Sequence, residues 1–144
     1  MRSIADILQR KARSGVVAVG VTDTVLEAVR QMDRANTGAV VVLDGDRVAG
    51  IFTERDLMRR VVLNGRDIAA TRVAEVMTRD LVFTSPDEAA EGAMAKMTRH
   101  RCRHLPVVEG ESLLGVLSIG DLMKELSEEQ TVEIHFLKEY IYSR

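Results

Sequence analysis

The chain has 144 residues, of which 46% are hydrophobic and 29% charged, and its formal net charge is −2. This balance is typical of an ordinary globular protein with one domain or two small ones, and it excludes a disordered or fibrous chain. The near-neutral charge and the small number of aromatic rings, three Phe and two Tyr, argue against nucleic-acid binding.

The N-terminus and the single cysteine indicate where the protein works. Residues 1–8 carry charges within their apolar part and show no cleavage site, so they do not resemble a secretory signal. No stretch approaches the length of 18 or more apolar residues that a membrane-spanning helix needs. Cys102 has no partner for an internal disulfide, which agrees with a reducing compartment. We therefore expect a cytoplasmic protein without a membrane anchor.

An internal repeat with an interval of 65 residues organises the chain. It aligns residues 17–59 with 82–124 without a gap, and it pairs Gly50 with Gly115 and Asp56 with Asp121. A related fragment precedes each copy, because residues 4–8 resemble residues 73–77. Repeats of this kind indicate one structural unit that is used twice.

Each copy predicts the order strand, helix, strand, strand, helix. Capping boxes at Thr24 and Ser85 predict where the first helix of each copy begins, and Asp44-Gly45 and Glu109-Gly110 predict hairpin turns. The closing helices are expected to begin at Thr53 and Ser118. The predicted strands are 16–19, 39–43 and 47–52 in the first copy and 81–83, 105–108 and 112–117 in the second.

The last segment of the chain lies outside the repeat. Apolar residues at helical spacing predict a final helix over 132–142; they are Val132, Phe136, Leu137, Tyr140 and Ile141. The predicted organisation is therefore a first domain with an N-terminal helix over 1–70, a second domain over 71–127, and a C-terminal helix over 128–144. The fold class is α+β (α/β).

Three motifs carry a resemblance to a known family. The pattern G-h-h-[ST]-x-x-D, where h is apolar, occurs as Gly50–Asp56 and again as Gly115–Asp121, and it is joined by Arg103-His-Leu-Pro-Val107 and Val73-Ala-Glu-Val-Met-Thr78. Together they resemble a tandem pair of cystathionine-β-synthase-type (CBS) domains, or Bateman module. The resemblance implies two β-α-β-β-α repeats that pack sheet to sheet with pseudo-twofold symmetry, and two clefts that bind adenine nucleotides such as AMP, ATP or NAD.

The signature residues suit a ribonucleotide chemically. Thr53 and Ser118 stand where a strand gives way to a helix, and the helix N-terminus favours an anion such as phosphate. Asp56 and Asp121 can accept hydrogen bonds from both hydroxyls of a ribose. The alternative is structural, because a hydroxyl followed three residues later by a carboxylate is also a helix cap. A residue can serve both purposes.

The two copies differ where the resemblance implies contacts to phosphate. The second copy has Arg103 and His104, whereas the first has Gly38 and Ala39, which carry no donor side chain. We therefore expect two unequal sites. Three further basic residues can supply the missing charge in the first copy, or can simply be solvated surface; they are Arg55, Lys11 and Arg13. The predicted ligand-binding residues are Thr53, Arg55, Asp56, Arg103, His104, Ser118 and Asp121.

A metal site at the start of the second repeat's middle strand is the weaker hypothesis. His100, Cys102 and His104 alternate along the chain and would share a face of a strand. A structural zinc site needs four ligands, and the neighbouring arginines oppose a cation. We expect no metal, and Cys102 is interpreted as a small buried residue.

The sequence favours a regulatory module that senses adenine nucleotides without catalysing a reaction. It contains no nucleophile–base arrangement and no P-loop, so we expect no enzyme. We expect a homodimer, because the apolar stripe over 132–141 needs burial and the resemblance implies pairing. The resemblance also implies a separate regulated protein. The alternative is a protein-interaction adaptor with unoccupied clefts, for which the apolar terminal helix would be the working surface.

Overall fold

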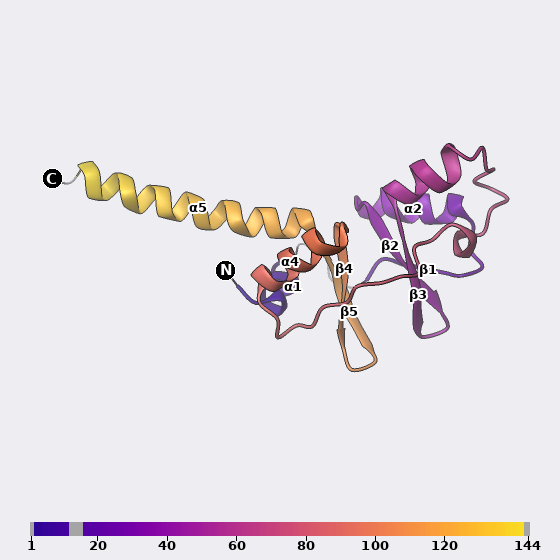
Figure 1. Cartoon of the computed structure of the whole chain (residues 1–144), viewed down its shortest axis with the longest axis horizontal. Coiled ribbons are helices and arrows are strands. Elements are labelled where there is room, and N and C mark those ends of the chain that lie inside the picture. Colours follow the sequence, from indigo (N-terminus) through magenta and orange to yellow (C-terminus); the bar gives the residue numbers. More distant parts are fainter. Residues whose placement is uncertain (1, 12–15, 143–144) are drawn as a thin grey trace. The chain divides into compact units, whose positions relative to one another are not determined.

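The computed structural model describes residues 2–11 and 16–142, apart from the side chains of residues 132, 133, 136 and 140–142. The chain divides into two compact units (Figure 1): one contains Met1–Ser14, Phe83–Glu109 and Gly115–Arg144, and the other contains Gly15–Val82 and Gly110–Leu114. Both units combine helices with β-strands, which confirms the α+β class. The predicted packing of sheet against sheet and the predicted domain limits stay predictions.

The first repeat forms a three-stranded sheet in the order β1-β2-β3. The central strand β2 (Ala39–Asp44) pairs in parallel with β1 (Ala18–Gly20) and antiparallel with β3 (Arg47–Thr53). Residues 39–42 of β2 are buried, which explains their continuous run of apolar residues. The predicted strands of this repeat are therefore confirmed, with β1 beginning two residues later than expected.

Helix α2 (Val25–Ala35) covers this sheet and begins where the sequence predicts. The Thr24 hydroxyl accepts a hydrogen bond from the Glu27 amide at 3.2 Å. The Glu27 carboxylate bonds Gln31 at 2.9 Å, within the helix. The buried face of α2 packs into the core of the unit that contains the first repeat. This face consists of Val25, Ala28 and Met32.

In the second repeat, the predicted first strand over 81–83 is wrong. Strands β4 (His104–Glu109) and β5 (Ser112–Ser118) form a two-stranded sheet, and the segment before them makes only an isolated parallel bridge between Thr84 and Val107. The side chain of Lys96 donates to the Phe83 carbonyl at 3.0 Å, so this carbonyl is bonded to a side chain. A turn over residues 85–88 then ends the extended stretch.

The predicted helix start at Ser85 is also wrong, because α4 spans Ala90–His100 with Ala89 as its cap. The Glu88 carboxylate accepts bonds from Thr84 Oγ1 at 2.5 Å and Lys96 Nζ at 2.8 Å. Burial raises the pKa of Glu88, but these hydrogen bonds outweigh it and leave the pKa below its ordinary value. The repeat itself gives the correct start, since Ala89 aligns with Thr24 at the interval of 65 residues.

Each repeat binds the fragment that precedes the other repeat. The N-terminal helix α1 (Ile4–Arg10) belongs to the unit of the second repeat, where the Ile4 amide donates to the Glu88 carbonyl at 3.1 Å. In the unit of the first repeat, the Val73 amide at the start of the short helix η2 (Val73–Glu75) makes the equivalent bond to the Asp23 carbonyl at 2.8 Å. The N-terminal helix therefore lies in the compact unit of the second repeat.

The helix that closes each repeat differs in length. The first closing helix consists of α3 (Glu54–Asp56) and a π-helical turn η1 (Leu57–Val62). The second, α5 (Ile119–Tyr142), runs for 24 residues without a break. The predicted separate helix over 132–142 is thus the continuation of α5. Within its stripe Leu137 is exposed, while Val132, Phe136, Tyr140 and Ile141 lie outside the described side chains. No helix in the described part of the chain is long and apolar enough to cross a membrane.

Replacement of Gly50 by alanine should destabilise the protein far more than the same change at Gly115. A Cβ at Gly50 would lie 2.6 Å from the Met77 sulfur and 2.7 Å from the Thr78 carbonyl oxygen, which paired backbone bonds to Ile51 hold in place. At Gly115 it would meet only a Leu8 side-chain methyl, at 3.2 Å. Urea unfolding should show a loss of roughly 3 kcal/mol for Gly50→Ala and less than about 1 kcal/mol for Gly115→Ala. Equal losses would contradict this packing.

Replacement of Arg101 by glycine should stabilise the protein. Arg101 ends α4 with a φ of 53°, a left-handed conformation, and the equivalent residue in the first repeat is Asn36, with a φ of 50°. Glycine adopts this conformation without a Cβ penalty, so Arg101→Gly should raise the free energy of unfolding by about 0.5–1 kcal/mol. Arg99→Gly, within the last turn of the same helix, is the matched control and should lower it by about 1 kcal/mol. A loss at both positions would rule out relief of the left-handed conformation.

Candidate functional site

The first signature builds a reciprocal cap between β3 and α3. The Thr53 hydroxyl accepts a hydrogen bond from the Asp56 amide at 3.2 Å, and the Asp56 carboxylate accepts one from the Thr53 amide at 3.1 Å. This is the structural alternative that the sequence left open. It satisfies two backbone donors that would otherwise be orphaned at the helix start.

The second signature builds the same cap between β5 and α5. The Asp121 carboxylate accepts from the Ser118 amide at 2.8 Å, and the Ser118 hydroxyl accepts from the Asp121 amide at 3.1 Å. The amide of Ile119, which directly follows Ser118, donates to the Arg103 carbonyl at 2.8 Å. Two amides of the first turn are therefore already bonded within the protein, and neither is available to an anion.

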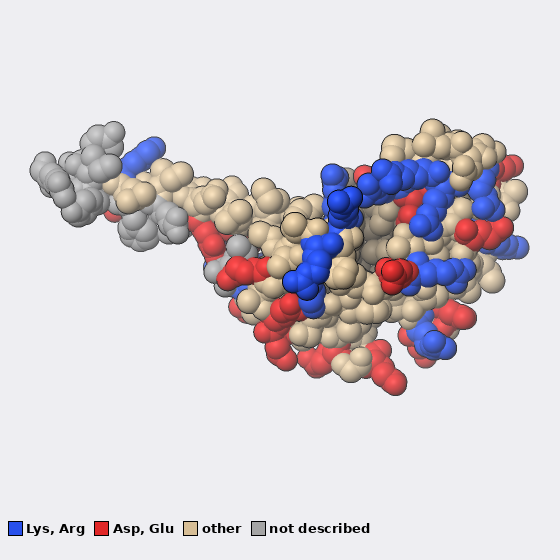
Figure 2. All heavy atoms as spheres, viewed as in Figure 1, with Lys and Arg blue, Asp and Glu red and all other residues tan. Residues whose placement is uncertain are grey.

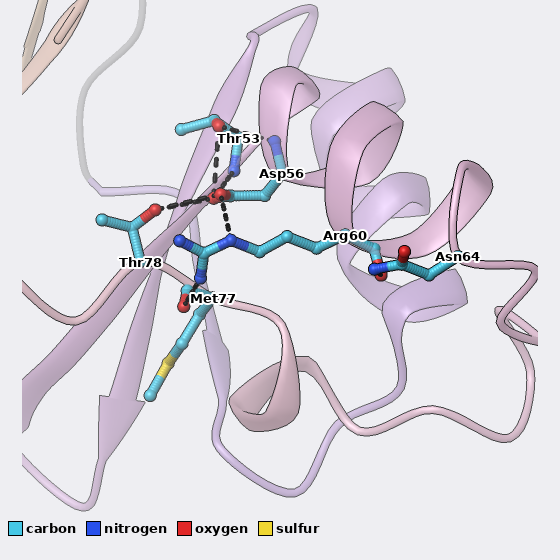
Figure 3. Close-up of polar contacts among 6 residues, drawn as sticks. All are labelled: Thr53, Asp56, Arg60, Asn64, Met77 and Thr78. Atoms are coloured by element: carbon cyan, nitrogen blue, oxygen red, sulfur yellow. Dashed lines mark hydrogen bonds and ion pairs between the residues drawn. The ribbon is translucent and has the colours of Figure 1, made fainter. Parts of the chain in front are cut away.

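In the first repeat, three side-chain groups surround the Asp56 carboxylate in addition to the Thr53 amide (Figure 3). The Thr78 hydroxyl lies 3.0 and 3.1 Å from its two oxygens, and the Thr53 hydroxyl lies 3.2 Å away. The Arg60 guanidinium lies 3.6 Å from the carboxylate and also donates to the Met77 carbonyl at 2.8 Å. Asp56 is only 6% exposed. A ligand can reach this carboxylate only if some of these contacts give way.

In the second repeat, the partner of the signature carboxylate is Lys11. Its ammonium nitrogen lies 3.0 Å from Asp121 Oδ2 and donates to the Val116 carbonyl at 2.8 Å. The Asp121 side chain is 19% exposed, compared with 8% for Asp56. Lys11, for which the sequence allowed either a role at the first site or a solvated surface, lies against the second signature. Arg13 lies outside the described residues.

The residues expected to contact phosphate are arranged unequally. Arg103 is exposed, and His104 is half-buried at the start of β4. The Arg103 carbonyl accepts the Ile119 amide, which places the Arg103 backbone beside the second signature turn. At the matching position of the first repeat, a Cβ on Gly38 would lie 3.3 Å from the carboxyl carbon of Glu54. The first turn thus has a carboxylate beside the position where the second has arginine, and Arg55 is exposed next to it.

Basic side chains gather on one face of the unit that carries α4 and β4. Figure 2 shows them as a band over these two elements, with acidic side chains along the margin of the same unit. The exposed arginines of this segment of the chain are Arg99, Arg101 and Arg103. The electrostatics of this face favour an anionic ligand over a cationic one.

Several residues that contact the signatures or lie beside them were not predicted from the sequence. Arg60 follows Asp56 by four residues, a helical spacing that does indicate an ion pair. Its equivalent in the second repeat is Glu125, which is 7% exposed and lies 3.6 Å from both Arg2 and Arg10. The pairing of Lys11 with Asp121 has no signal in the sequence, since 110 positions separate the two residues.

The hypothesis of a metal site gains no support. Within residues 2–11 and 16–142, no group of three or more His, Cys, Asp or Glu residues is placed to hold a metal ion. Cys102 is half-buried, and burial raises the pKa of its thiol. A raised pKa makes the reactive thiolate scarcer at neutral pH.

Comparison with known proteins identifies the repeat. The CBS domain family model matches residues 4–63 and again residues 73–128. The CBS domain-containing protein CBSX3 of Arabidopsis thaliana, a mitochondrial protein, is 34% identical over 147 residues, which span 96% of this chain and 71% of the relative.

Solved structures agree with this assignment. A protein with CBS domains from Burkholderia ambifaria MC40-6 is 43% identical, with a TM-score of 0.85 over 90% of this chain and 96% of that chain. The CBS domain pair of protein MJ0100, solved in complex with 5′-methylthioadenosine and S-adenosyl-L-methionine, is 19% identical with a TM-score of 0.78 over 90% of this chain and 98% of that chain, and shows likeness of fold. The chain therefore belongs to the CBS-domain family and consists of two CBS domains in tandem.

Proposed function

We propose that this CBS pair is a non-catalytic sensor that binds an adenine nucleotide at its signature turns and regulates a separate protein. The observation that carries the proposal is the duplicated turn, in which a carboxylate and a hydroxyl stand together at a helix start. The second turn adds Arg103, His104 and Lys11 in the same unit. Such a set offers acceptors for ribose hydroxyls and cations for phosphate.

The second turn is the better candidate for the primary site. Its carboxylate is more exposed than that of Asp56 and has fewer hydroxyl partners. Asp121 would accept from the ribose, while Arg103 and His104 would donate to phosphate. In the first turn, Thr53, Arg55 and Asp56 would form a weaker site, since binding there must displace Thr78 and Arg60.

The identity of the nucleotide follows only in outline from this chemistry. AMP, ATP and NAD all present a ribose next to phosphate, and the MJ0100 pair carries adenosyl ligands without phosphate. A ligand changes the module only as far as its affinities for two conformations differ. The cytoplasmic location remains a prediction.

A protein-interaction adaptor is the second candidate function. Both signature carboxylates already have partners within the chain, as they would in a module whose sites stay unoccupied. Exposed apolar side chains then provide the working surface; those on η1 and directly after it are Met58, Val62 and Leu63.

Replacement of Ser118 by alanine should abolish most of the thermal stabilisation by AMP or ATP. The variant loses a helix cap, which costs about 1 kcal/mol, and with it the hydroxyl that this proposal also assigns to the ligand. Thr24→Ala is the matched control, because it removes the same kind of cap from α2, a helix that neither signature begins. The control should unfold earlier but keep the full, concentration-dependent shift. The nucleotide-sensor proposal fails if wild-type protein shows no shift with AMP, ATP or NAD.

The protein should form a homodimer through the apolar surface of η1. Met58, Val62 and Leu63 are 50%, 63% and 73% exposed, and three large apolar residues on one turn favour a contact with another protein. Light scattering at micromolar concentration should give about twice the chain mass of 16.0 kDa, and Val62→Glu should return it to monomer. Leu137→Glu on α5 should leave the dimer intact. Dissociation by Leu137→Glu alone would place the contact on α5, and a monomeric wild type would refute the dimer.

A further inference from the structure

The ammonium group of Lys11 is fixed at the second signature by two acceptors. Its distances are 2.8 Å to the Val116 carbonyl and 3.0 Å to Asp121 Oδ2. An ammonium group has three donors, and within the described residues no further acceptor bonds the third. The Lys11 side chain is 33% exposed, so a ligand at the turn can reach this donor.

Lys11 also sets the charge that a ligand meets at this turn. A phosphate close to an unpaired Asp121 would be repelled, whereas the ion pair cancels the carboxylate. Arg103, whose backbone carbonyl accepts the Ile119 amide of the same turn, carries a second positive charge. One helical turn further along α5, Glu125 is itself paired with Arg2 and Arg10, and Arg10 also pairs with Glu128. The charge paired with Asp121 is therefore the positive charge of Lys11, and the residue whose carbonyl bonds the turn, Arg103, is also positive.

The first signature provides the internal comparison. There the cation beside the carboxylate is Arg60, whose guanidinium also bonds the Met77 carbonyl. The neighbour of Gly38 is the Glu54 carboxylate, so Arg55 is balanced by a negative charge next to it in the chain. The first turn carries roughly no net charge, and it lacks the positive excess of the second.

We propose that Lys11 is a specificity-determining residue that makes the second signature select phosphorylated nucleosides over unphosphorylated ones. The proposal rests on the nucleotide-sensor function proposed above and adds its selectivity. Lys11 acts in two ways: it neutralises Asp121, and it donates its third N–H to a phosphate oxygen. The ribose hydroxyls still bond the remaining acceptor positions of the Asp121 carboxylate, which has about four.

The test compares AMP with adenosine by titration calorimetry on the full chain. Wild-type protein should bind AMP more tightly, and this preference should shrink as salt is raised. Lys11→Met should weaken AMP binding about tenfold, as expected for loss of one charge-assisted hydrogen bond, and should change adenosine binding less than about threefold. Lys11→Arg should retain the preference. Lys138→Met, on an exposed lysine of α5 roughly 25 Å from Asp121, should behave as wild type.

Distinct outcomes separate failure of this proposal from failure of the sensor function. If wild-type protein binds neither AMP nor adenosine, the sensor function fails and the selectivity with it. If both bind but Lys11→Met weakens them by the same factor, Lys11 only holds α1 against α5 and the selectivity proposal is refuted. Equal wild-type affinities for AMP and adenosine also refute it. Lys11→Gln, which keeps a donor for the Val116 carbonyl without the charge, gives the same comparison if the methionine variant does not fold.

Discussion

One carboxylate in each repeat joins the end of a strand to the beginning of a helix. Asp56 and Asp121 accept the backbone N–H of the residue three positions earlier, and the hydroxyl of that residue accepts theirs. The two bonds fix the direction in which the closing helix leaves the sheet. A ligand that bonds the same carboxylate therefore meets a group that is already hydrogen-bonded. Its binding free energy is the difference between the free energy of the new contacts and that of the contacts that it replaces.

Each signature carboxylate is contacted by a side chain from a segment outside its own repeat. The fragment before the second repeat brings Thr78 to Asp56, and the fragment before the first repeat brings Lys11 to Asp121. Charge is redistributed accordingly: where the first repeat has Arg60, the second has the buried Glu125, which takes its cations from Arg2 and Arg10. The two repeats share the backbone of the signature turn, while their polar partners differ as sets whose charges compensate one another.

Local physical rules account for what the sequence predicted correctly. Apolar runs and turn residues located five of the six expected strands, and the paired signature located both caps. Two errors arose near Ser85: the expected helix start followed a local capping pattern against the register of the repeat, and the apolar run over 81–83 forms no strand. The pairing of Lys11 with Asp121 and the closeness of Glu54 to Gly38 depend on side-chain placement. Neither the hydrophobic pattern nor the repeat predicts such contacts, because both locate helices, strands and buried faces and not the polar side chains that meet in the fold.

The unequal partners of the two carboxylates give the turns different consequences when they are occupied. A ligand that bonds Asp121 meets Lys11, which directly follows α1 and is paired with the same carboxylate. Helix α1 is tied to α5 by the ion pairs of Arg10 with Glu125 and Glu128. A ligand that bonds Asp56 competes instead with Thr78, whose backbone is paired with Ile51 of β3. Occupancy of the second turn thus acts at the C-terminal end of α1, which side-chain ion pairs hold, whereas backbone hydrogen bonds anchor the first turn of this helix. Occupancy of the first acts on a segment held by backbone hydrogen bonds, which resists displacement more strongly.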